Sequence, residues 1–529
     1  MQYKFIIFIS IGLIITTQPS YIHPDEHFQS LEILSNLFFN IKGTIPWEFN
    51  PLHSARSYVP LLLNYSPFFL LIKSFPILKT PSIILYGSRL INLSIFLLTI
   101  FYILNLKKIT KYFILTSFVT FTLQSHTFSN SLETIILLWV LNLYSKNIDK
   151  SSKSFANSIW IGTLISLGVF NRMTFPAFIL LPSIYMLFTY YAYNIFSLII
   201  IVSSFLTTSC LCILIDSKIY GAKKNIFIIT PLNNFLYNLY VQNLKLHGLH
   251  AWYTHLLINL PQLVGPLIII LPWSIFQILS NIRQKTMQNS SEQKRKYFIT
   301  LSSLSLIGSL MLLSLFKHQE LRFLTPLMPL IIIVILEPFT KSKYNKFLNS
   351  NKLCYLKISW ILFNFFMSLL LGCFHQTGII KYISTFQSNN ITPQTQDSIG
   401  IHIWWKTYSP PTWMYLNQNL IVSTTTIKSD IETIDDINFD ILQNHIIDLK
   451  GSDINLLNDT LHTYLMNDTL NNATLILPRS VTSKLINLKD NFVFTQIYST
   501  NVHLDLDHID FDDLSSLYPG LIAYSVRHK

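Results

Sequence analysis

The chain has 529 residues, of which 50% are hydrophobic and only 12% are charged, about half the charged share of ordinary soluble domains. This composition argues against a purely soluble protein. The net charge of +12 does not indicate a nucleic-acid partner, because residues 391–529 hold 16 of the 26 acids and only 8 of the 38 bases. Long apolar stretches separated by basic clusters are instead typical of a polytopic membrane protein, here followed by an acidic C-terminal segment.

Segment length predicts where the chain crosses a membrane, because a span needs roughly 20 mostly apolar residues. Residues 5–17 resemble a signal peptide, but no small-residue cleavage site follows them, so we predict a retained first span. The sequence therefore predicts an all-α polytopic membrane protein with about 11 transmembrane helices. The candidate spans are 3–18, 82–104, 112–126, 132–145, 156–170, 174–192, 195–215, 256–280, 298–316, 323–339 and 358–375.

The basic clusters predict the orientation of these spans. Lys and Arg gather around residues 107–111, 146–153, 283–296 and 341–357, and all four clusters fall on one side if the N-terminus is cytoplasmic. This arrangement requires that residues 58–72 do not cross the membrane, so we predict an interfacial or re-entrant segment there. The other side then receives the loop 19–58 and everything after about residue 376.

The C-terminal segment has the pattern of a small soluble domain. Residues 420–427 alternate between apolar and polar side chains, as a half-buried strand does. We therefore predict a transmembrane domain over residues 1–380 and a mixed α/β domain over residues 381–529 on the non-cytoplasmic side. Its sequons at Asn390, Asn458, Asn467 and Asn472 are compatible with a location on that side.

The first cluster of polar residues, His23 to Glu32, follows the first span directly. Pro24 and the acids after it suit the start of a helix. Adjacent carboxylates flanked by two histidines at a membrane surface also supply a general base and groups that bind phosphate or sugar hydroxyls. The spacing His23-x-Asp25-x-His27 leaves a metal site as a third, weaker interpretation.

Other polar clusters lie at the ends of apolar runs. Residues 317–323, Lys-His-Gln-Glu-Leu-Arg-Phe, are either a snorkelling cap or a clamp for a lipid phosphate, since Arg offers paired donors and Lys a point charge. Residues 244–250 carry two histidines in an interfacial loop. Residues 127–133 and 171–174 are short polar stretches at the ends of apolar runs. Arg89 lies inside a predicted span, where an arginine needs a partner such as a phosphate.

Together these motifs resemble those of the endoplasmic-reticulum mannosyltransferases that use dolichyl phosphate mannose. The resemblance covers residue 20 to about residue 415, and within the family it is strongest to the fungal members that act on the GPI precursor. Leu321 is a minor departure that leaves the catalytic positions intact. The matching segments are His23–Glu32, Thr127–Glu133, His247–His250 with Tyr253–His255, His318–Phe323, His375–Gln376 and Trp405–Tyr408.

The resemblance implies a GT-C fold with a catalytic carboxylate in the first lumenal loop of an endoplasmic-reticulum membrane protein. It implies transfer of mannose from dolichyl phosphate mannose to the third mannose of the GPI precursor in an α-1,2 linkage, without a cofactor or metal ion. Asp25 would take the proton of the acceptor hydroxyl, assisted by Glu26, and inversion at the sugar carbon follows from attack opposite the phosphate.

The same resemblance supplies candidates for the remaining roles. The donor phosphate would be bound by Arg89, Lys317, His318 and Arg322. The acceptor or other parts of the substrates would be contacted by His23, His27, Glu133, His247, His250 and Glu320.

Three alternatives stay open at this point. The chain could act on an earlier GPI mannose or on the lipid-linked N-glycan precursor. A membrane transporter fits less well, because its functional charges lie at midspan and Gly or Pro often breaks its helices, whereas this chain has only 14 Gly. A non-catalytic subunit of a glycosylation complex is the third, and the oligomeric state is open.

Overall fold

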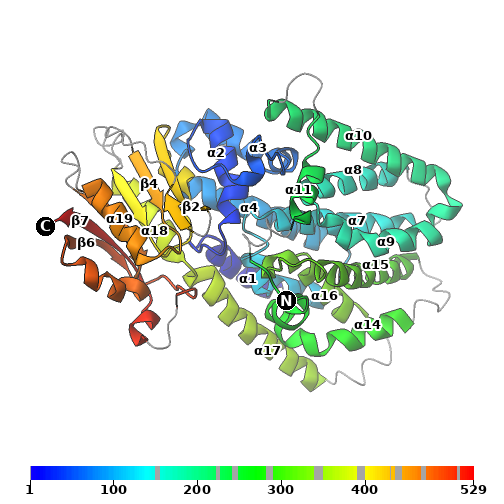
Figure 1. The fold of residues 1–529 in the computed structure, drawn as a ribbon. Helices are drawn as coiled ribbons and strands as arrows, with labels where there is room; N and C mark the ends of the chain where they lie inside the picture. Colours follow the sequence, from blue (N-terminus) through cyan, green and yellow to red (C-terminus); the bar gives the residue numbers. More distant parts are fainter. Residues whose placement is uncertain are drawn as a thin grey trace. The chain divides into compact units, whose positions relative to one another are not determined.

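The computed structural model groups the chain into two compact units (Figure 1). The helical unit comprises residues 1–13, 46–67 and 89–367, and the sheet unit comprises residues 14–45, 68–88 and 368–529. Residues 19–45 of the first loop thus belong to the same unit as the C-terminal segment, whereas residues 46–58 belong to the helical unit. The domain boundary between residues 380 and 381 stays a prediction. The described residues are 2–148, 155–221, 227–240, 248–280, 290–338, 350–389, 400–428, 431–434, 444–465, 472–508 and 513–529.

Most of the described elements are helices. The α-helices are α1 (Gln2–Thr16), α2 (Glu32–Phe39), α3 (Val59–Ser74), α4 (Pro81–Leu98), α5 (Lys108–Leu115), α6 (Phe118–Phe121), α7 (Ser129–Asn147), α8 (Phe155–Asn171), α9 (Phe175–Thr189), α10 (Ile195–Ile219), α11 (Thr230–Leu239), α13 (Leu260–Val264), α14 (Leu271–Ser280), α15 (Ser290–Leu313), α16 (Leu327–Leu336), α17 (Ser350–Leu369), α18 (Thr377–Asn389) and α19 (Ile454–Leu465). Short π-helical turns occur at His27–Leu31, Thr99–Ile103, His255–Asn259 and Leu370–Phe374.

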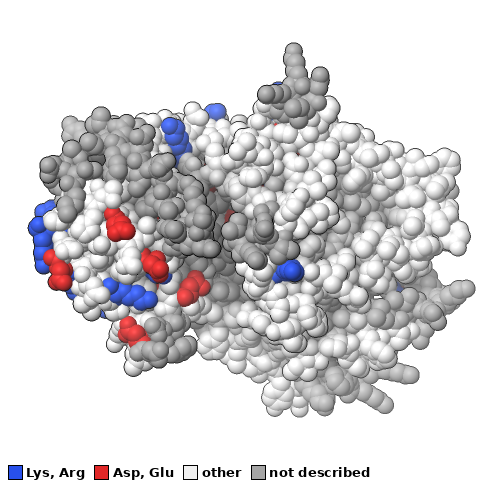
Figure 2. Space-filling model, viewed as in Figure 1, with Lys and Arg blue, Asp and Glu red and all other residues white. Residues whose placement is uncertain are grey.

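Among the described residues, five helical segments are long and apolar enough to cross a membrane, or six if one bent pair counts as a single span. The predicted number of 11 is therefore not confirmed. Several predicted spans correspond to shorter apolar helices, including α8 and α16. On the face drawn in Figure 2, the described surface over α8, α9, α10 and α15 is almost free of charged side chains, as expected for helices that contact lipid. The five segments are Pro81–Ile103, Phe175–Tyr193, Ile195–Ile219, Glu292–Leu313 and Leu353–Phe374.

The prediction of a single span over residues 112–126 is wrong. The segment contains the end of α5, the short helix α6 and irregular turns, and it is almost entirely buried. Its hydroxyl side chains bond nearby carbonyls, with Thr120 Oγ1 donating to Ile114 O at 2.6 Å, and Asn364 Oδ1 accepts the backbone N–H of Phe118 at 2.7 Å. Such side-chain bonds compete with the helical backbone pattern, so apolar composition alone did not give a continuous helix.

In the helical unit α8 packs between α7 and α10, and α15 packs against α7, α9 and α16 (Figure 1). Every residue of α16 is buried, as expected for a helix that is apolar all round, because such a helix lies in a protein core or in a membrane. The carboxylate that follows it, Glu337, accepts hydrogen bonds from Lys107 N at 2.9 Å and Thr110 Oγ1 at 2.6 Å, with Arg295 Nε at 3.5 Å. These donors satisfy a charge that would otherwise be costly to bury.

The sheet unit contains a seven-stranded mixed sheet in the order β3-β2-β4-β1-β5-β7-β6. The four central strands β2, β4, β1 and β5 run parallel, whereas β3 pairs antiparallel with β2, and β7 pairs antiparallel with β5 and β6. The predicted mixed α/β region is thus confirmed, and β2 covers the alternating stretch 420–427. The strands are β1 (Ile401–Trp404), β2 (Leu420–Lys428), β3 (Ile431–Ile434), β4 (Asn444–Asp448), β5 (Ala473–Pro478), β6 (Phe492–Thr500) and β7 (Leu521–His528).

Residue alternation along β1 sends side chains to both faces of this sheet. Ile401 and Ile403 join the apolar core that α19 covers. His402 and Trp404 face the other way, and both rings contact Tyr382 of α18, at centroid distances of 5.7 and 5.5 Å. Both faces of the strand are therefore enclosed, which explains why all four of its residues are buried.

Glu32, the first residue of α2, bonds the segment after β1. Its Oε1 accepts hydrogen bonds from Thr412 Oγ1 at 2.7 Å and from the backbone N–H of Trp413 at 3.1 Å. Gly43 approaches the same carboxylate so closely that a Cβ there would lie 2.3 Å from Oε2. Burial raises the pKa of Glu32 to about 8, although the two hydrogen bonds lower it.

These contacts predict the stability of Glu32 variants. Glu32→Ala leaves two buried donors without an acceptor, at about 1–3 kcal/mol each, so the unfolding temperature of the detergent-solubilised chain should fall. Glu32→Gln keeps a carbonyl oxygen as acceptor and should stay close to wild type at pH 5.5.

The raised pKa of Glu32 adds a pH dependence. Between the ordinary pKa of 4.5 and about 8, the folded chain binds this proton more strongly than the unfolded chain, so stability declines as the pH rises through that window. The unfolding temperature of the wild type should therefore fall more steeply from pH 5.5 to 8 than that of Glu32→Gln. Equal slopes in the two proteins would contradict the assignment.

Candidate active site

In the sheet unit the first polar motif, His23 to Glu32, forms the helical turns that lead into α2. The backbone N–H groups of His27 and Phe28 both bond Pro24 O, and a π-helical turn follows from His27 to Leu31 before α2 begins. π-turns are rare and occur frequently at functional sites. The predicted helix start at Pro24 is confirmed, with the difference that the turn that follows it, from His27 to Leu31, is wider than an α-helical one.

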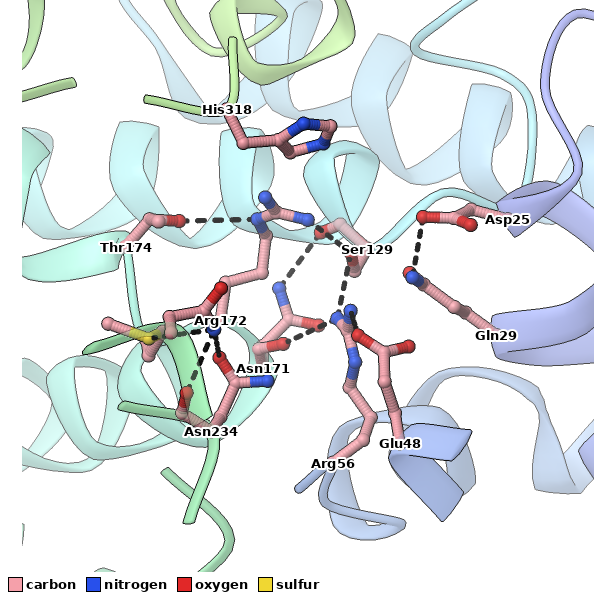
Figure 3. A network of polar contacts seen from close by, with 12 residues as sticks. Asp25, Gln29, Glu48, Arg56, Ser129, Asn171, Arg172, Thr174, Asn234 and His318 are labelled. Carbon is pink, nitrogen blue, oxygen red and sulfur yellow. Dashed lines mark hydrogen bonds and ion pairs between the residues drawn. The ribbon is translucent and has the colours of Figure 1, made fainter. Parts of the chain in front are cut away.

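The two adjacent carboxylates have different surroundings. The Asp25 side chain is 22% exposed, whereas that of Glu26 is fully buried. Gln29 Nε2 donates to Asp25 Oδ2 at 2.5 Å, and His23 Nδ1 lies 3.7 Å from Asp25 Oδ1. Asp25 is therefore the accessible member of the pair, and Gln29 holds it from one helical turn away (Figure 3).

His27 is fully buried next to Glu26. Its Nε2 lies 3.9 Å from Glu26 Oε2, and its Nδ1 receives a hydrogen bond from Trp413 Nε1 at 3.2 Å. The imidazole lies between the ring of Tyr21, in an edge contact at 4.8 Å, and that of Trp413, stacked at 6.1 Å. Three positions of the motif, His23, Asp25 and His27, therefore do not converge on one point, and the described residues contain no group of three or more ligands placed for a metal ion.

Segments that are distant in sequence meet around this motif within the sheet unit. Tyr21 and His375 pair through their backbones, with His375 Nδ1 also 2.9 Å from Tyr21 O. The Tyr21 hydroxyl donates to Ser409 O at 2.7 Å. Burial, with the nearby Asp448 as a second cause, raises the pKa of Tyr21, so the hydroxyl stays protonated.

In the helical unit the motif at residues 317–323 places a histidine between two hydrogen-bond acceptors. His318 Nε2 lies 2.7 Å from Glu320 Oε1, and its Nδ1 lies 3.2 Å from Gly248 O. Both partners are acceptors, so this geometry favours the form in which both ring nitrogens donate and the imidazole is cationic. Burial is the largest single effect and lowers the pKa of His318, but the hydrogen bond and the charge of Glu320, together with the bond to Gly248 O, outweigh it, and the pKa is raised overall.

Two predicted clusters therefore come together here. His250 Nδ1 accepts the backbone N–H of Gln319 at 3.3 Å, and the His250 and His318 rings lie 5.9 Å apart. Arg322 pairs with Glu320, the same carboxylate that binds His318. Lys317 is exposed and contributes its carbonyl to the His250 N–H. His247 lies outside the described residues.

The ring of Phe323 lies close to two guanidinium groups. Arg172 Cζ lies 5.0 Å from the ring centroid and Arg322 Cζ lies 5.1 Å from it, while the His318 ring makes an edge contact at 5.5 Å. Cations at such distances are attracted by the π-electrons of the ring. The aromatic ring thus helps to hold three cationic side chains in one region of the helical unit.

A second pair of arginines meets at the start of α7 (Figure 3). Arg56 Nη1 and Arg172 Nη1 both donate to Ser129 Oγ, at 3.2 and 2.9 Å. Each guanidinium also has its own carboxylate: Glu48 lies 2.7 Å from Arg56, and Glu133 lies 3.3 Å from Arg172. These pairs offset the repulsion between two cations that share one hydroxyl.

This network changes the list of candidate residues. Glu133, for which the resemblance implies a substrate contact, is fully buried and paired with Arg172, and that contact stays a prediction. Arg56 was not predicted, although it is the one arginine in the loop 19–58. In the sequence alone, Arg172 is only one of several polar residues at the end of an apolar run. Arg89 is fully buried in α4, one turn before Asn92, and its predicted role stays a prediction.

Comparison with known proteins gives a consistent result. The model of the Alg9-like mannosyltransferase family matches residues 3–417. A protein named GPI mannosyltransferase 4 from Saccharomyces cerevisiae is 42% identical, over 100% of this chain and 99% of its own length. A relative of the same name from Candida glabrata is 38% identical and covers 95% of each chain.

The fold has a solved counterpart. The crystal structure of ArnT from Cupriavidus metallidurans in the apo state aligns with a TM-score of 0.51 and 11% sequence identity, over 98% of this chain and 97% of that one. At this identity the likeness concerns the fold alone, and it supports the GT-C fold that the family resemblance implies. The length of the family match and the full-length relatives show that the chain belongs to the Alg9-like mannosyltransferase family and is a glycosyltransferase.

Proposed function

We propose that the chain transfers mannose from dolichyl phosphate mannose to the third mannose of the GPI precursor, in an α-1,2 linkage and with inversion. The names of its full-length relatives support the acceptor class. The observation that carries the mechanism is the pair of unlike carboxylates, with Asp25 accessible and held by Gln29, and Glu26 buried beside it.

In the proposed mechanism Asp25 removes the proton of the acceptor hydroxyl as the sugar carbon develops positive charge and the phosphate departs. A carboxylate suits this role because it accepts a proton and is partly exposed to the incoming hydroxyl. Glu26 assists Asp25 by placing a second negative charge next to it. Attack from the face opposite the phosphate gives the inverted product.

The departing dolichyl phosphate needs positive charge that is already in place. Cationic His318 and Arg322 are the strongest candidates, because Glu320 and Phe323 hold both of them. Exposed Lys317 and buried Arg89 are further candidates, and His23, His250 and Glu320 are candidates for substrate contacts. We propose that these side chains make a divalent ion unnecessary.

The proposed location is the endoplasmic-reticulum membrane, with the N-terminus in the cytoplasm and the first loop and C-terminus in the lumen. The distribution of basic clusters in the sequence supports this orientation. The bilayer, the lipid-linked donor and the GPI precursor are then the partners of the chain.

The first prediction concerns the base. Asp25→Asn keeps the size of the side chain and its bond to Gln29 but removes the acceptor of the proton, so transfer should fall by about 10²–10⁴-fold. The measurement is mannose transfer from dolichyl phosphate mannose to a three-mannose GPI acceptor in membranes with matched expression. Wild-type activity in the variant would exclude Asp25 as the base.

The same assay with other acceptors tests the substrate. Transfer by the wild type to the three-mannose intermediate supports the proposal. Transfer only to a two-mannose GPI intermediate or to an N-glycan precursor would keep the mechanism but change the acceptor.

The second prediction concerns His318. Its raised pKa means that the positive charge is complete at low pH and is lost as the pH rises through that pKa, so the donor KM of the wild type should increase on the alkaline side. In His318→Gln no proton is lost in this pH range. The donor KM of this variant should therefore be raised at every pH and should not increase further on the alkaline side. An unchanged alkaline limb in the variant would exclude His318 as its source.

The third prediction concerns metal ions. If side chains supply the charge for the phosphate, prolonged treatment with EDTA followed by its removal should leave transfer within about twofold of the untreated membranes. Loss of activity that Mn²⁺ or Mg²⁺ restores would contradict the proposed metal-independent mechanism.

A further inference from the structure

Trp413 lies 386 residues after His27 in the sequence, yet their side chains bond each other within the sheet unit. Both residues are fully buried. Trp413 also bonds the far end of the π-turn, since its backbone N–H donates to Glu32 at 3.1 Å. One residue of the C-terminal segment thus holds both ends of the turn that starts directly after the carboxylate pair.

The chemistry of the indole group determines the protonation of His27. An indole N–H donates and cannot accept, so His27 Nδ1, at 3.2 Å from Trp413 Nε1, must be the accepting nitrogen. A neutral imidazole with an accepting Nδ1 carries its proton on Nε2. That nitrogen faces Glu26 Oε2 at 3.9 Å, a distance at which the N–H dipole and the carboxylate interact electrostatically without a direct hydrogen bond.

We propose that Trp413 is a positioning residue of the active site: its indole N–H keeps His27 neutral, with the proton on the nitrogen that faces Glu26. This inference rests on the proposed roles of Asp25 and Glu26. Trp413 does not touch substrate in this account. It acts through His27, which directs its N–H toward the buried carboxylate and so keeps Glu26 in place beside the base.

Trp405 offers a matched control. It is also a fully buried tryptophan of the sheet unit, and its Nε1 donates to Ser452 O at 2.9 Å, a partner with no part in the proposed mechanism. Trp405→Phe and Trp413→Phe therefore each remove one buried indole donor while keeping an aromatic ring. A general loss of stability should affect both variants, whereas an effect on His27 belongs to Trp413→Phe alone.

Transfer kinetics on the full-length chain in membranes test the proposal. Trp413→Phe should lower kcat by about tenfold or more with acceptor KM changed by less than about threefold, because a misplaced catalytic group costs rate rather than binding. Trp405→Phe should keep kcat within about threefold of wild type. Similar kcat losses in the two variants would overturn the proposal.

A double-mutant cycle shows whether Trp413 acts through His27. When His27→Leu has already removed the acceptor of the indole N–H, adding Trp413→Phe should cost less than about twofold more in single-turnover rate, since coupled residues are not additive. An undiminished loss in the His27→Leu background would show that Trp413 is only structural.

A spectroscopic measurement is independent of turnover. The wild-type chain is labelled with ¹⁵N-histidine for NMR, and the signal that disappears in His27→Gln is assigned to His27. At neutral pH this signal should show an unprotonated Nδ1 and a protonated Nε2. A proton on Nδ1, or on both nitrogens, would overturn the proposal. Absence of transfer to any GPI acceptor would instead refute the proposed function and leave the tautomer result standing.

Discussion

The hydrogen bonds of Glu32 with Thr412 and Trp413 are the interaction on which the sheet unit depends. A buried carboxylate is costly unless its oxygens are bonded, and both donors come from the segment that follows β1. This bond ties the motif of the first loop to the parallel sheet. These bonds hold α2 against a folded domain. This matters because α2 has only eight residues, and a helix of that length is not stable on its own.

In the helical unit, ion pairs offset the cost of burying charged side chains. Arg56, Arg172 and Arg322 each have a carboxylate partner, and Ser129 and Phe323 bring the guanidinium groups close together. Burying an unpaired ion costs several kcal/mol, so the pairing allows cations to be kept in an apolar surrounding. His318 differs from the arginines because it can lose its charge, and its bonds to Glu320 and Gly248 O favour the charged form.

Neighbouring residues of the first motif have different proposed roles. Asp25 is exposed enough to meet a hydroxyl, while Glu26 and His27 are closed off by Tyr21 and Trp413. Preorganisation of this kind is the usual means by which a protein fixes a reacting group without reorganisation during the reaction. The wide π-turn that follows the carboxylates offers a physical reason for the arrangement, because it alters the spacing of the side chains directly after them.

The sequence by itself determined the class of protein: apolar runs and low charge indicate membrane helices, alternation at residues 420–427 predicts β2, and the motif residues indicate the family. Only the tertiary structure decided how residues 112–126 break, which carboxylate is buried, and that Arg56, Arg172 and Trp413 join the candidate sites. Periodicity is local and reports which face of a helix or strand is apolar. The choice of a hydrogen-bond partner 386 residues away depends on how the elements pack, and no local pattern carries that information.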